Sequence, residues 1–277
     1  MTSVKRITGI VFFIILFTGW LTSKQMAITL DDLPFAYSPG LSEQARFSYF
    51  YRILDILDQY EIQTAGFVVG EQVSPRRYQC LLDFHNRGHI IANHTFSHPD
   101  LNNLSAGDFS EDIIKCNQVI EEFYNEVKYF RYPMLHRGNS IEKRDSVYDF
   151  LHRQGFIIAS VSIDNDEYAF NKAYLDTLTY GDTAAADSIG EEYLAYMISI
   201  SNYYDSLALE LTGREINHIL LLHMNYLNSV YLDDLIELLM KDGWEFLPFS
   251  EAIQDSVYLL PDNYIGTRGI SWLERIQ

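Results

Sequence analysis

The sequence predicts an α/β protein, an irregular (β/α) barrel of about seven parallel strands with a helical insertion between the last two motif-bearing strands. Three observations predict this class. Short apolar runs alternate with amphipathic helical segments, as in a parallel sheet covered by helices. The chain of 277 residues, 48% of them hydrophobic, is long enough for one core of barrel size. Ionisable residues recur where the apolar runs end, which is where barrels build their active sites.

Residues 1–25 are expected to lie outside this fold. Lys5 and Arg6 precede an apolar run over 7–21 that is shorter than the ~20 residues of a membrane-spanning helix. This pattern favours a secretory signal over an uncleaved anchor, although 22–25 is a poor cleavage site. We therefore expect the domain over 26–277 to be exported, and the membrane to be a partner only if the leader stays attached.

The first half of the chain supplies four of the expected strands. In order we expect a strand over 26–30, a helix over 42–61, a strand over 64–69, a helix over 74–87, a strand leading into His94, a helix over 108–125 and a strand over 127–130. The helices are amphipathic, and Ser42 and the pair Ser74-Pro75 are typical helix starts.

The second half adds three strands and the insertion. We expect a helix over 141–154, a strand over 157–163, two inserted helices over 168–212 that break at Gly181-Asp182, a strand over 216–222, a helix over 232–241, a strand over 244–247 and a tail over 259–277. Ile270, Trp272 and Leu273 should pack this tail on the barrel. Cys80 and Cys116 are expected to be buried free thiols.

The charge balance excludes one class of partner. A net charge of −18 and a pI near 4.7 argue against nucleic acid, because phosphate binding needs a basic face. The charge does not identify a substrate.

Candidate functional residues stand at the carboxyl ends of five different expected strands. They are Asp31-Asp32, the pair His94 and His98, Arg131, Asp164 and His223. The carboxyl ends of barrel strands converge on one face, so we expect these side chains to meet there. Any one of them alone could be structural, but structural histidines and carboxylates have no reason to collect on one face.

These residue types suit hydrolysis assisted by a metal ion. Two histidines and one carboxylate form a three-ligand divalent site with an open position for water. Zn²⁺ is favoured, with Co²⁺, Ni²⁺ and Mn²⁺ as alternatives. Neighbouring residues on a strand point to opposite faces, so one of Asp31 and Asp32 can bind the ion while the other acts as general base. Arg131 can keep one carboxylate ionised, and His223, oriented by Asp164, can protonate a leaving group.

Five segments together resemble the polysaccharide deacetylase family. The segment 29–34 (Thr-Leu-Asp-Asp-Leu-Pro) is similar to the family's first motif, T-F-D-D-G-P, and 93–98 (Asn-His-Thr-Phe-Ser-His) matches the second, N-H-[ST]-x-x-H. Residues 131–133 match the start of the third motif, R-x-P, 164–168 resemble the fourth, D-x-x-D-W, and 221–223 match the fifth, L-x-H. The motifs occur in the family's order over about 26–225.

The resemblance implies a role for each matching residue. Asp31 would be the general base and His223 the general acid, with Arg131 paired to Asp31 and Asp164 to His223. Asp32, His94 and His98 would hold the metal ion, and Tyr132, Pro133 and Leu221 would contact substrate. The implied reaction is attack of a metal-bound water on the N-acetyl amide, or O-acetyl ester, of a glycan such as chitin, peptidoglycan or xylan.

Four departures from the family pattern concern substrate range. Leu33 replaces the glycine of the first motif and is expected to put an apolar side chain near the mouth of the site. Leu135 stands where the third motif often carries glycine, and Glu167-Tyr168 replaces Asp-Trp in the fourth. The insertion over 168–212 can cover the groove, so a long polymer is not expected to fit easily.

Two other functions stay open at this stage. One is hydrolysis of another C–N bond in a small molecule, favoured by a closed groove but not by a leader sequence. The other is a glycan-binding module without turnover, which would require a ligand or the acid to be missing. Acetate release from acetylated glycans distinguishes both from a deacetylase.

Overall fold

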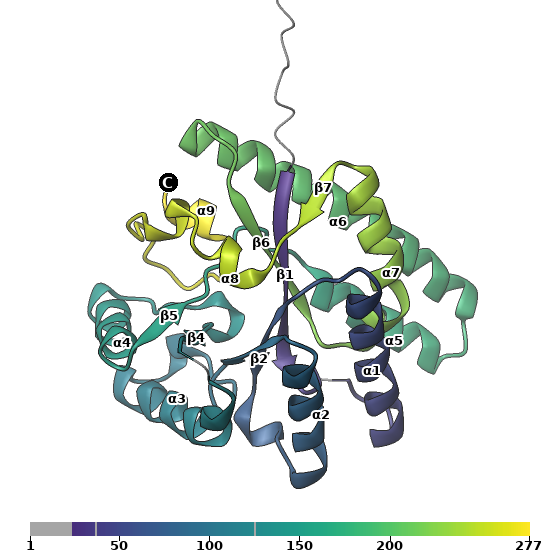
Figure 1. Ribbon diagram of the computed structural model, residues 1–277, viewed down its shortest axis with the longest axis horizontal. Coiled ribbons are helices and arrows are strands. Elements are labelled where there is room, and N and C mark those ends of the chain that lie inside the picture. Colours follow the sequence, from purple (N-terminus) through teal and green to yellow (C-terminus); the bar gives the residue numbers. More distant parts are fainter. Residues whose placement is uncertain (1–23, 37, 125) are drawn as a thin grey trace, which may run out of the picture.

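The computed structural model describes residues 24–36, 38–124 and 126–277. In this part of the chain seven parallel strands form one sheet. The strands are β1 (Lys24–Leu33), β2 (Ala65–Val68), β3 (Ile90–Asn93), β4 (Lys128–Phe130), β5 (Phe156–Ile158), β6 (Asn217–His223) and β7 (Trp244–Phe246). Their order is β5-β4-β3-β2-β1-β6, and β7 pairs with the start of β1. The long strand β1 is therefore the centre of the sheet (Figure 1).

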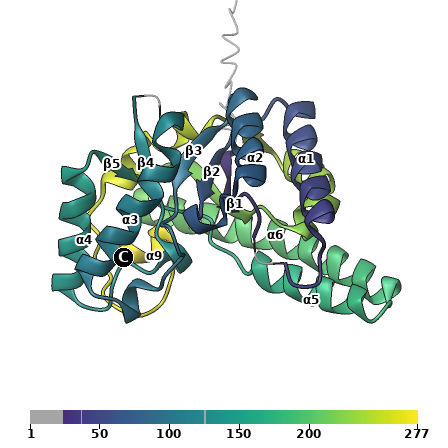
Figure 2. The same ribbon diagram turned by 90° about the horizontal axis from the view of Figure 1, so that it is seen from below.

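Most helices cover the outer face of the sheet, whereas the short one at Phe249–Ala252 packs against Ala27, Phe67 and Ile219 on the inner face. The helices are α1 (Glu43–Gln59), α2 (Pro75–Asn86), α3 (Ala106–Ile120), α4 (Ile141–Arg153), α5 (Glu167–Thr179), α6 (Thr183–Thr212), α7 (Tyr226–Lys241), α8 (Phe249–Ala252) and α9 (Trp272–Arg275). Most begin at a side-chain cap, such as Ser42 on α1 and Ser74 on α2. The expected alternation of strands and helices is thus confirmed, and the carboxyl ends of the strands share one face, seen from below in Figure 2.

The sheet closes into a distorted barrel through a single bridge. The sequence predicts one strand over 157–163, but β5 ends at Ile158, and the chain then leaves β4 and crosses to β6. There Ile163 pairs with Leu220. The residues between lose strand pairing because other groups bind them. The Ser162 hydroxyl accepts from the Ile219 N–H at 2.8 Å, and the Trp272 N–H donates to the Val161 carbonyl at 2.6 Å.

The C-terminal tail supports this closure. Ile270, Trp272 and Leu273 are all at least nine-tenths buried, which confirms the expected packing of the tail on the barrel. The Ser271 hydroxyl donates to the Ser162 carbonyl at 2.7 Å. The tail therefore satisfies backbone groups that no neighbouring strand reaches.

The expected insertion is a helical hairpin of α5 and α6, which extends beyond the sheet at one side of the molecule (Figure 2). The break lies at Gly181 and Asp182, as the sequence predicts. Gly181 has a φ of +75°, and Asp182 caps α6 by accepting from the Ala185 N–H. Both α5 and α6 pack on α7.

The amino-terminal boundary needs a small correction. Residues 1–23 of the expected leader lie outside the described residues, but Lys24 and Gln25 pair with β7 and so belong to the sheet. No helix among the described residues is long and apolar enough to cross a membrane. Cys80 and Cys116 are buried and unpaired, as expected.

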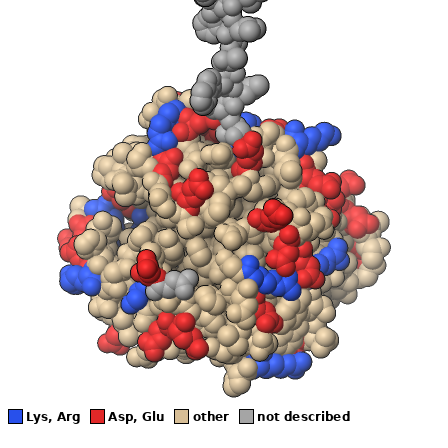
Figure 3. Space-filling view, in the orientation of Figure 1, with Lys and Arg blue, Asp and Glu red and all other residues tan. Residues whose placement is uncertain are grey.

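The surface shows the acidic balance of the chain. On the face drawn in Figure 3, over the described residues, acidic side chains are interspersed with basic ones, and the basic ones form no continuous patch. This face does not have the character of a phosphate-binding surface.

Candidate active site and metal centre

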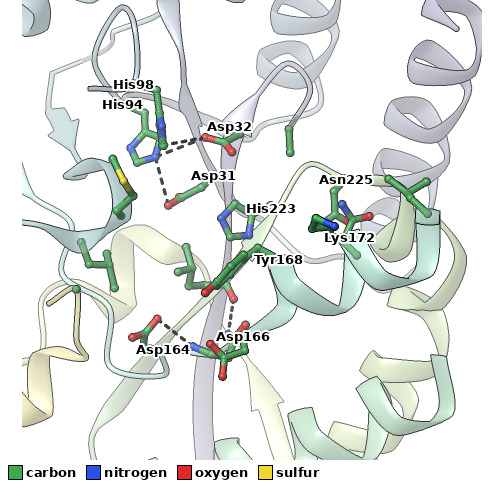
Figure 4. Close-up of a pocket in the computed structure, with 18 of the residues that line it drawn as sticks. Asp31, Asp32, His94, His98, Asp164, Asp166, Tyr168, Lys172, His223 and Asn225 are labelled. Carbon is green, nitrogen blue, oxygen red and sulfur yellow. Dashed lines mark hydrogen bonds and ion pairs between the residues drawn. The ribbon is translucent and has the colours of Figure 1, made fainter. Parts of the chain in front are cut away.

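Three side chains converge at the carboxyl ends of β1 and β3 (Figure 4). Asp32, His94 and His98 each offer one ligand atom, and these atoms lie within 4.8 Å of one another. Asp32 Oδ1 is 3.7 Å from His94 Nε2 and 3.4 Å from His98 Nε2. Ligand atoms around one divalent ion are separated by about 3–4 Å when each bond is ~2.1 Å. The spacing therefore fits a shared metal ion.

A left-handed backbone turn brings both aspartates to the same face. Asp32 has a φ of +63°, and the pairing of β1 with β2 shifts register between Leu30 and Leu33. This irregularity breaks the alternation of a regular strand, so Asp31 and Asp32 both face the site. Asp31 Oδ2 lies 3.6 Å from His94 Nε2, close to the 3.7 Å from that nitrogen to Asp32 Oδ1.

His94 is prepared to be a neutral ligand. Its Nδ1–H donates to the carbonyl of Arg131 at 2.9 Å, which leaves the lone pair of Nε2 facing Asp32 and His98. Burial, and then the neighbouring His98, lower the pKa of His94 to about 3. Asp32 Oδ1 is buried without a hydrogen-bond donor among the described residues. A buried acceptor without a donor, beside two imidazole nitrogens, has the donor set of a divalent metal site.

Arg131 holds Asp31 from inside the barrel. Its Nη1 donates to Asp31 Oδ1 at 2.6 Å and to the Thr29 hydroxyl at 2.8 Å. Its Nε donates to the Ala159 carbonyl at 3.1 Å, and its guanidinium lies 3.9 Å from the ring centre of Phe67. One oxygen of Asp31 is therefore bound, and the other faces the candidate metal site.

Glu167, and not Asp164, binds His223. The sequence assigns this position to Asp164, but the structure places Glu167 Oε2 2.7 Å from His223 Nδ1. Asp164 instead accepts from the N–H of Asn165 at 2.9 Å, and it lies apart from the metal ligands in Figure 4. Asn165 causes this arrangement, because its side chain bonds both the Leu221 carbonyl and the Glu167 N–H. These two bonds fix the first residue of α5 beside the end of β6.

The Glu167 carboxylate changes the charge of His223. Burial alone would lower the pKa of His223, but the charge and hydrogen bond of Glu167 outweigh it and raise that pKa to about 9. Since Nδ1 faces Glu167, Nε2 is the nitrogen left for the cavity. His223 is therefore a protonated imidazole at neutral pH.

Sequence reasoning also missed the amides that hold Glu167. Asn225 and Asn228 both donate to Glu167 Oε1. They come from the start of α7, directly after His223. The only signal in the sequence is their position just beyond the fifth motif, together with the second acidic position of the fourth motif, where Glu167 stands.

A cavity of about 600 Å³ opens in front of these groups. One wall is α5, which contributes Tyr168, Asn171, Lys172, Leu175 and Asp176. The lining also includes Met134, Leu135, His136 and Gly269. The inserted hairpin therefore borders the site, as the sequence suggests.

Two expected substrate contacts do not line this cavity. Leu221 lines it, whereas Tyr132 and Pro133 are buried and absent from its wall. The Tyr132 ring stacks on Phe109 at 6.0 Å instead. Their expected place is taken by Met134 and Leu135, because the chain turns sharply there with φ near +55° at both residues.

Comparison with known proteins identifies the family. The profile of the family described as Polysaccharide deacetylase matches residues 19–150, and the fold and the candidate metal site agree with it. The chain belongs to the polysaccharide deacetylase family.

Curated members of this family are only distantly similar to the chain. A peptidoglycan-N-acetylglucosamine deacetylase of Bacillus cereus is 27% identical over 164 residues, which are 59% of this chain and 52% of that protein. A chitin deacetylase of Colletotrichum lindemuthianum is 28% identical over 181 residues, 61% of this chain and 64% of that protein. The matched stretches thus span between half and two thirds of these relatives.

Solved structures show the same fold. The chitin deacetylase from Colletotrichum lindemuthianum has a TM-score of 0.56 at 21% identity and covers 89% of this chain and 93% of its own. A CE4 family pseudoenzyme from Bacillus anthracis has a TM-score of 0.57 at 17% identity and covers 84% of this chain and 66% of its own. The fold is therefore shared by proteins described as a deacetylase and as a pseudoenzyme.

The departure from the family at Leu33 has a different consequence from the one expected. Leu33 is fully buried and does not narrow the mouth of the site. A Cβ at Gly66 would lie 2.3 Å from Leu33 Cδ2, so the leucine side chain fills the space above a glycine of β2. The left-handed backbone occurs one residue earlier, at Asp32. A leucine fits at this position because its side chain packs in the core and does not enter the cavity.

The departure at Leu135 does reach the cavity. Leu135 adopts a φ of +54°, a conformation that favours glycine, and lines the wall beside Met134. Gly269 of the tail packs against this turn, since a Cβ there would lie 1.9 Å from the Met134 carbonyl oxygen. The tail therefore supports a strained turn at the edge of the site.

Proposed function

We propose that the chain is an exported, metal-dependent deacetylase that hydrolyses the N-acetyl amide, or the O-acetyl ester, of a glycan. One observation carries the proposal: the Asp32–His94–His98 group lies in one cavity with an arginine-bound Asp31 and a carboxylate-bound His223. Family membership supports the reaction class, because the curated relatives are described as peptidoglycan and chitin deacetylases.

Asp32, His94 and His98 would hold the divalent ion. Zn²⁺ suits two imidazoles and one carboxylate, and Co²⁺, Ni²⁺ and Mn²⁺ accept the same ligands. A solved relative, an acetyl xylan esterase from Clostridium thermocellum, is described as a complex with cobalt. When bound, the ion would polarise an acetyl carbonyl and make a water molecule more acidic.

Asp31 is the proposed general base. Arg131 donates to Oδ1 of Asp31 and to the Thr29 hydroxyl group from the inside of the barrel. Oδ2 faces the metal ligands, 3.6 Å from His94 Nε2, where it can accept the proton of an attacking water molecule. A buried ion pair of this kind also keeps the carboxylate from turning away.

His223 is the proposed general acid. Its Nδ1–H is bound by Glu167, and its imidazole is protonated below a pKa of about 9. The Nε2–H can therefore donate a proton to the leaving amine or alcohol at neutral pH. In this assignment Glu167 takes the orienting role that the sequence suggests for Asp164.

The acetate-release assay tests the proposal directly. Purified protein should release acetate from acetylated chitooligosaccharides or from peptidoglycan, and a chelator should abolish release until a divalent ion is added back. Asp31→Asn should reduce kcat by roughly a thousandfold or more, since removal of a general base typically costs 10²–10⁴. Asp166→Asn is the matched control, because Asp166 is an exposed aspartate at the rim of the same cavity.

A non-catalytic glycan-binding protein is the second candidate, because a pseudoenzyme of this family shares the fold. Metal-loaded protein that binds acetylated oligosaccharides but releases no acetate from a broad panel would favour this candidate. Activity on a small cyclic imide or ureide, with none on glycans, would favour the small-molecule hydrolase instead.

Export is proposed from the leader pattern and from the relatives, which are described as deacetylases of peptidoglycan and of chitin. Mass spectrometry of the protein purified from its natural host would decide whether residues 1–25 are removed. An intact Met1 in the membrane fraction would contradict cleavage and support an anchor.

A further inference from the structure

Behind Glu167 lies a fully buried chain of polar side chains that reaches the inserted helix α6. Glu167 has no exposed surface, and both of its carboxylate oxygens are bound. Oε2 accepts from His223, and Oε1 accepts from Asn225 and from Asn228, the latter at 2.6 Å. Asn228 in turn accepts from the hydroxyl of Tyr193 at 2.8 Å. Tyr193 belongs to α6, so this second inserted helix is linked to the histidine through three hydrogen bonds.

The orientation of the Asn228 amide follows from its partners. Its Nδ2 donates to Glu167 Oε1 and, at 2.9 Å, to the carbonyl of His223. Both partners are acceptors only, so the NH₂ group must face them. A flipped amide would direct its oxygen at the Glu167 carboxylate and leave both acceptors without this donor in a buried site.

Tyr193 supplies the donor that holds the amide in this orientation. Its hydroxyl faces Asn228 Oδ1, and its side chain is fully buried. Burial, and then the nearby Glu167 charge, raise the pKa of Tyr193 well above its ordinary value. The phenol therefore keeps its proton and is a permanent donor.

The position of α6 is fixed one turn away from Tyr193. A Cβ at Gly190 would lie 2.0 Å from the ring of Tyr231 on α7. Only glycine allows the two helices to approach this closely, and residues three apart lie on the same helix face. Tyr193 is thus held directly against the start of α7, where Asn228 stands.

We propose that Tyr193 and Asn228 are positioning residues for His223. Tyr193 orients the Asn228 amide, and this amide, with Asn225, holds the Glu167 carboxylate against Nδ1 of the imidazole. The inference rests on the proposed function, in which His223 is the general acid. It makes the inserted hairpin part of the catalytic apparatus, in addition to a wall of the cavity.

This arrangement also explains why glutamate can stand in the fourth motif. A glutamate side chain is one methylene longer than the aspartate of the family pattern, so its carboxylate has more possible positions. The two amides bind the carboxylate from the side opposite His223, and the tyrosine hydroxyl holds the Asn228 amide in place, so that freedom is removed.

Tyr193→Phe tests the proposal with the smallest change. It removes one hydroxyl and should lower kcat roughly tenfold, with KM close to wild type. The melting temperature should fall by a few degrees, because the buried Oδ1 of Asn228 loses its donor. Tyr204→Phe is the matched control. Tyr204 is also a buried tyrosine of α6, but its hydroxyl donates to Glu274 at 3.1 Å and not to this network. Asn228→Asp, which replaces a donor to Glu167 by an acceptor, should lower kcat further than Tyr193→Phe.

A second readout needs no substrate. The Nδ1 proton of His223, held against a carboxylate, should give a downfield proton resonance that Tyr193→Phe shifts or broadens and Tyr204→Phe does not. An unchanged kcat and an unchanged resonance in Tyr193→Phe would overturn the inference. Wild-type protein that releases no acetate would count against the proposed function alone, because the resonance still reports on the hydrogen-bond network.

Discussion

Replacing Glu167 with glutamine removes the charge beside His223 while an oxygen remains available for its Nδ1 proton. The pKa of His223 is raised to about 9 from an ordinary 6.5, although burial alone would lower it. At 1.36 kcal/mol for each pKa unit, the site favours the imidazolium by about 3 kcal/mol. Glu167 is the main source, and the charges of Asp32 and Asp31 add to it.

We expect the pKa of His223 in Glu167→Gln to fall to 6.5 or below. A general acid must be protonated, so activity is lost as the pH rises through its pKa. At pH 8 an imidazole with a pKa near 9 is about nine-tenths protonated, whereas one with a pKa near 6.5 is about 3% protonated. The variant should therefore lose roughly thirtyfold in kcat/KM at pH 8, and its alkaline limb should move to lower pH.

Two measurements check this prediction. An NMR titration of the His223 ring protons gives its pKa directly, and acetate release between pH 6 and pH 10 gives the alkaline limb. Asp164→Asn is the control, since Asp164 is the residue that the sequence alone assigns to His223. A pKa that stays near 9 in Glu167→Gln, or one that falls equally in Asp164→Asn, would refute the reasoning.

Three further predictions follow from the geometry. Asp32→Asn should weaken Zn²⁺ binding by at least roughly a hundredfold in titration calorimetry, because a buried charged ligand is lost. Leu33→Gly should reduce the free energy of unfolding by about 3–5 kcal/mol in urea, because it empties the core space above Gly66. Burial raises the pKa of Asp164 to about 7 from 3.8. Ionisation of this buried carboxyl group lowers the free energy of unfolding, fully so above pH 7, and the loss disappears as the pH falls toward 4. Asp164→Asn should therefore stabilise the protein at pH 8, by about 1–2 kcal/mol after allowance for solvent screening, in urea unfolding at pH 4 and pH 8.

Each of these predictions has a contrary outcome. Unchanged Zn²⁺ affinity in Asp32→Asn would show that the ion is held elsewhere. A Leu33→Gly variant with wild-type stability and a wider substrate range would restore the sequence-based idea that Leu33 narrows the mouth. A stabilisation by Asp164→Asn that is equal at pH 4 and pH 8 would show that the carboxyl does not titrate as described.

The sequence was sufficient for those parts of the site that depend on strand ends. Asp31 and His94 come together because parallel strands deliver their carboxyl ends to one face, whatever the details of the loops between. Arg131 reaches Asp31 for the same reason. The order of the motifs and the alternation of strands and helices can be predicted correctly even when the predicted ends of the elements are wrong by a few residues.

Side-chain direction could not be predicted in the same way. Leu33 points into the core and Asp32 into the site because the positive φ falls on Asp32. The residue types at these positions do not predict that backbone conformation. Tyr132 is turned inward and Met134 outward by a second left-handed turn, supported by Gly269 from the far end of the chain. Such turns depend on contacts between distant segments.

The amino-acid order by itself therefore determined the barrel, its inserted hairpin and the set of acidic, histidine and arginine side chains on its rim. Only the folded chain decided that Glu167 and not Asp164 faces His223, and that Tyr193 of the insertion stands behind it. The physical reason is that the barrel is built by backbone pairing between strands, and the strands can be recognised from a pattern that repeats along the chain. The partner of a buried imidazole is chosen by hydrogen bonds a few ångströms long between segments far apart in sequence.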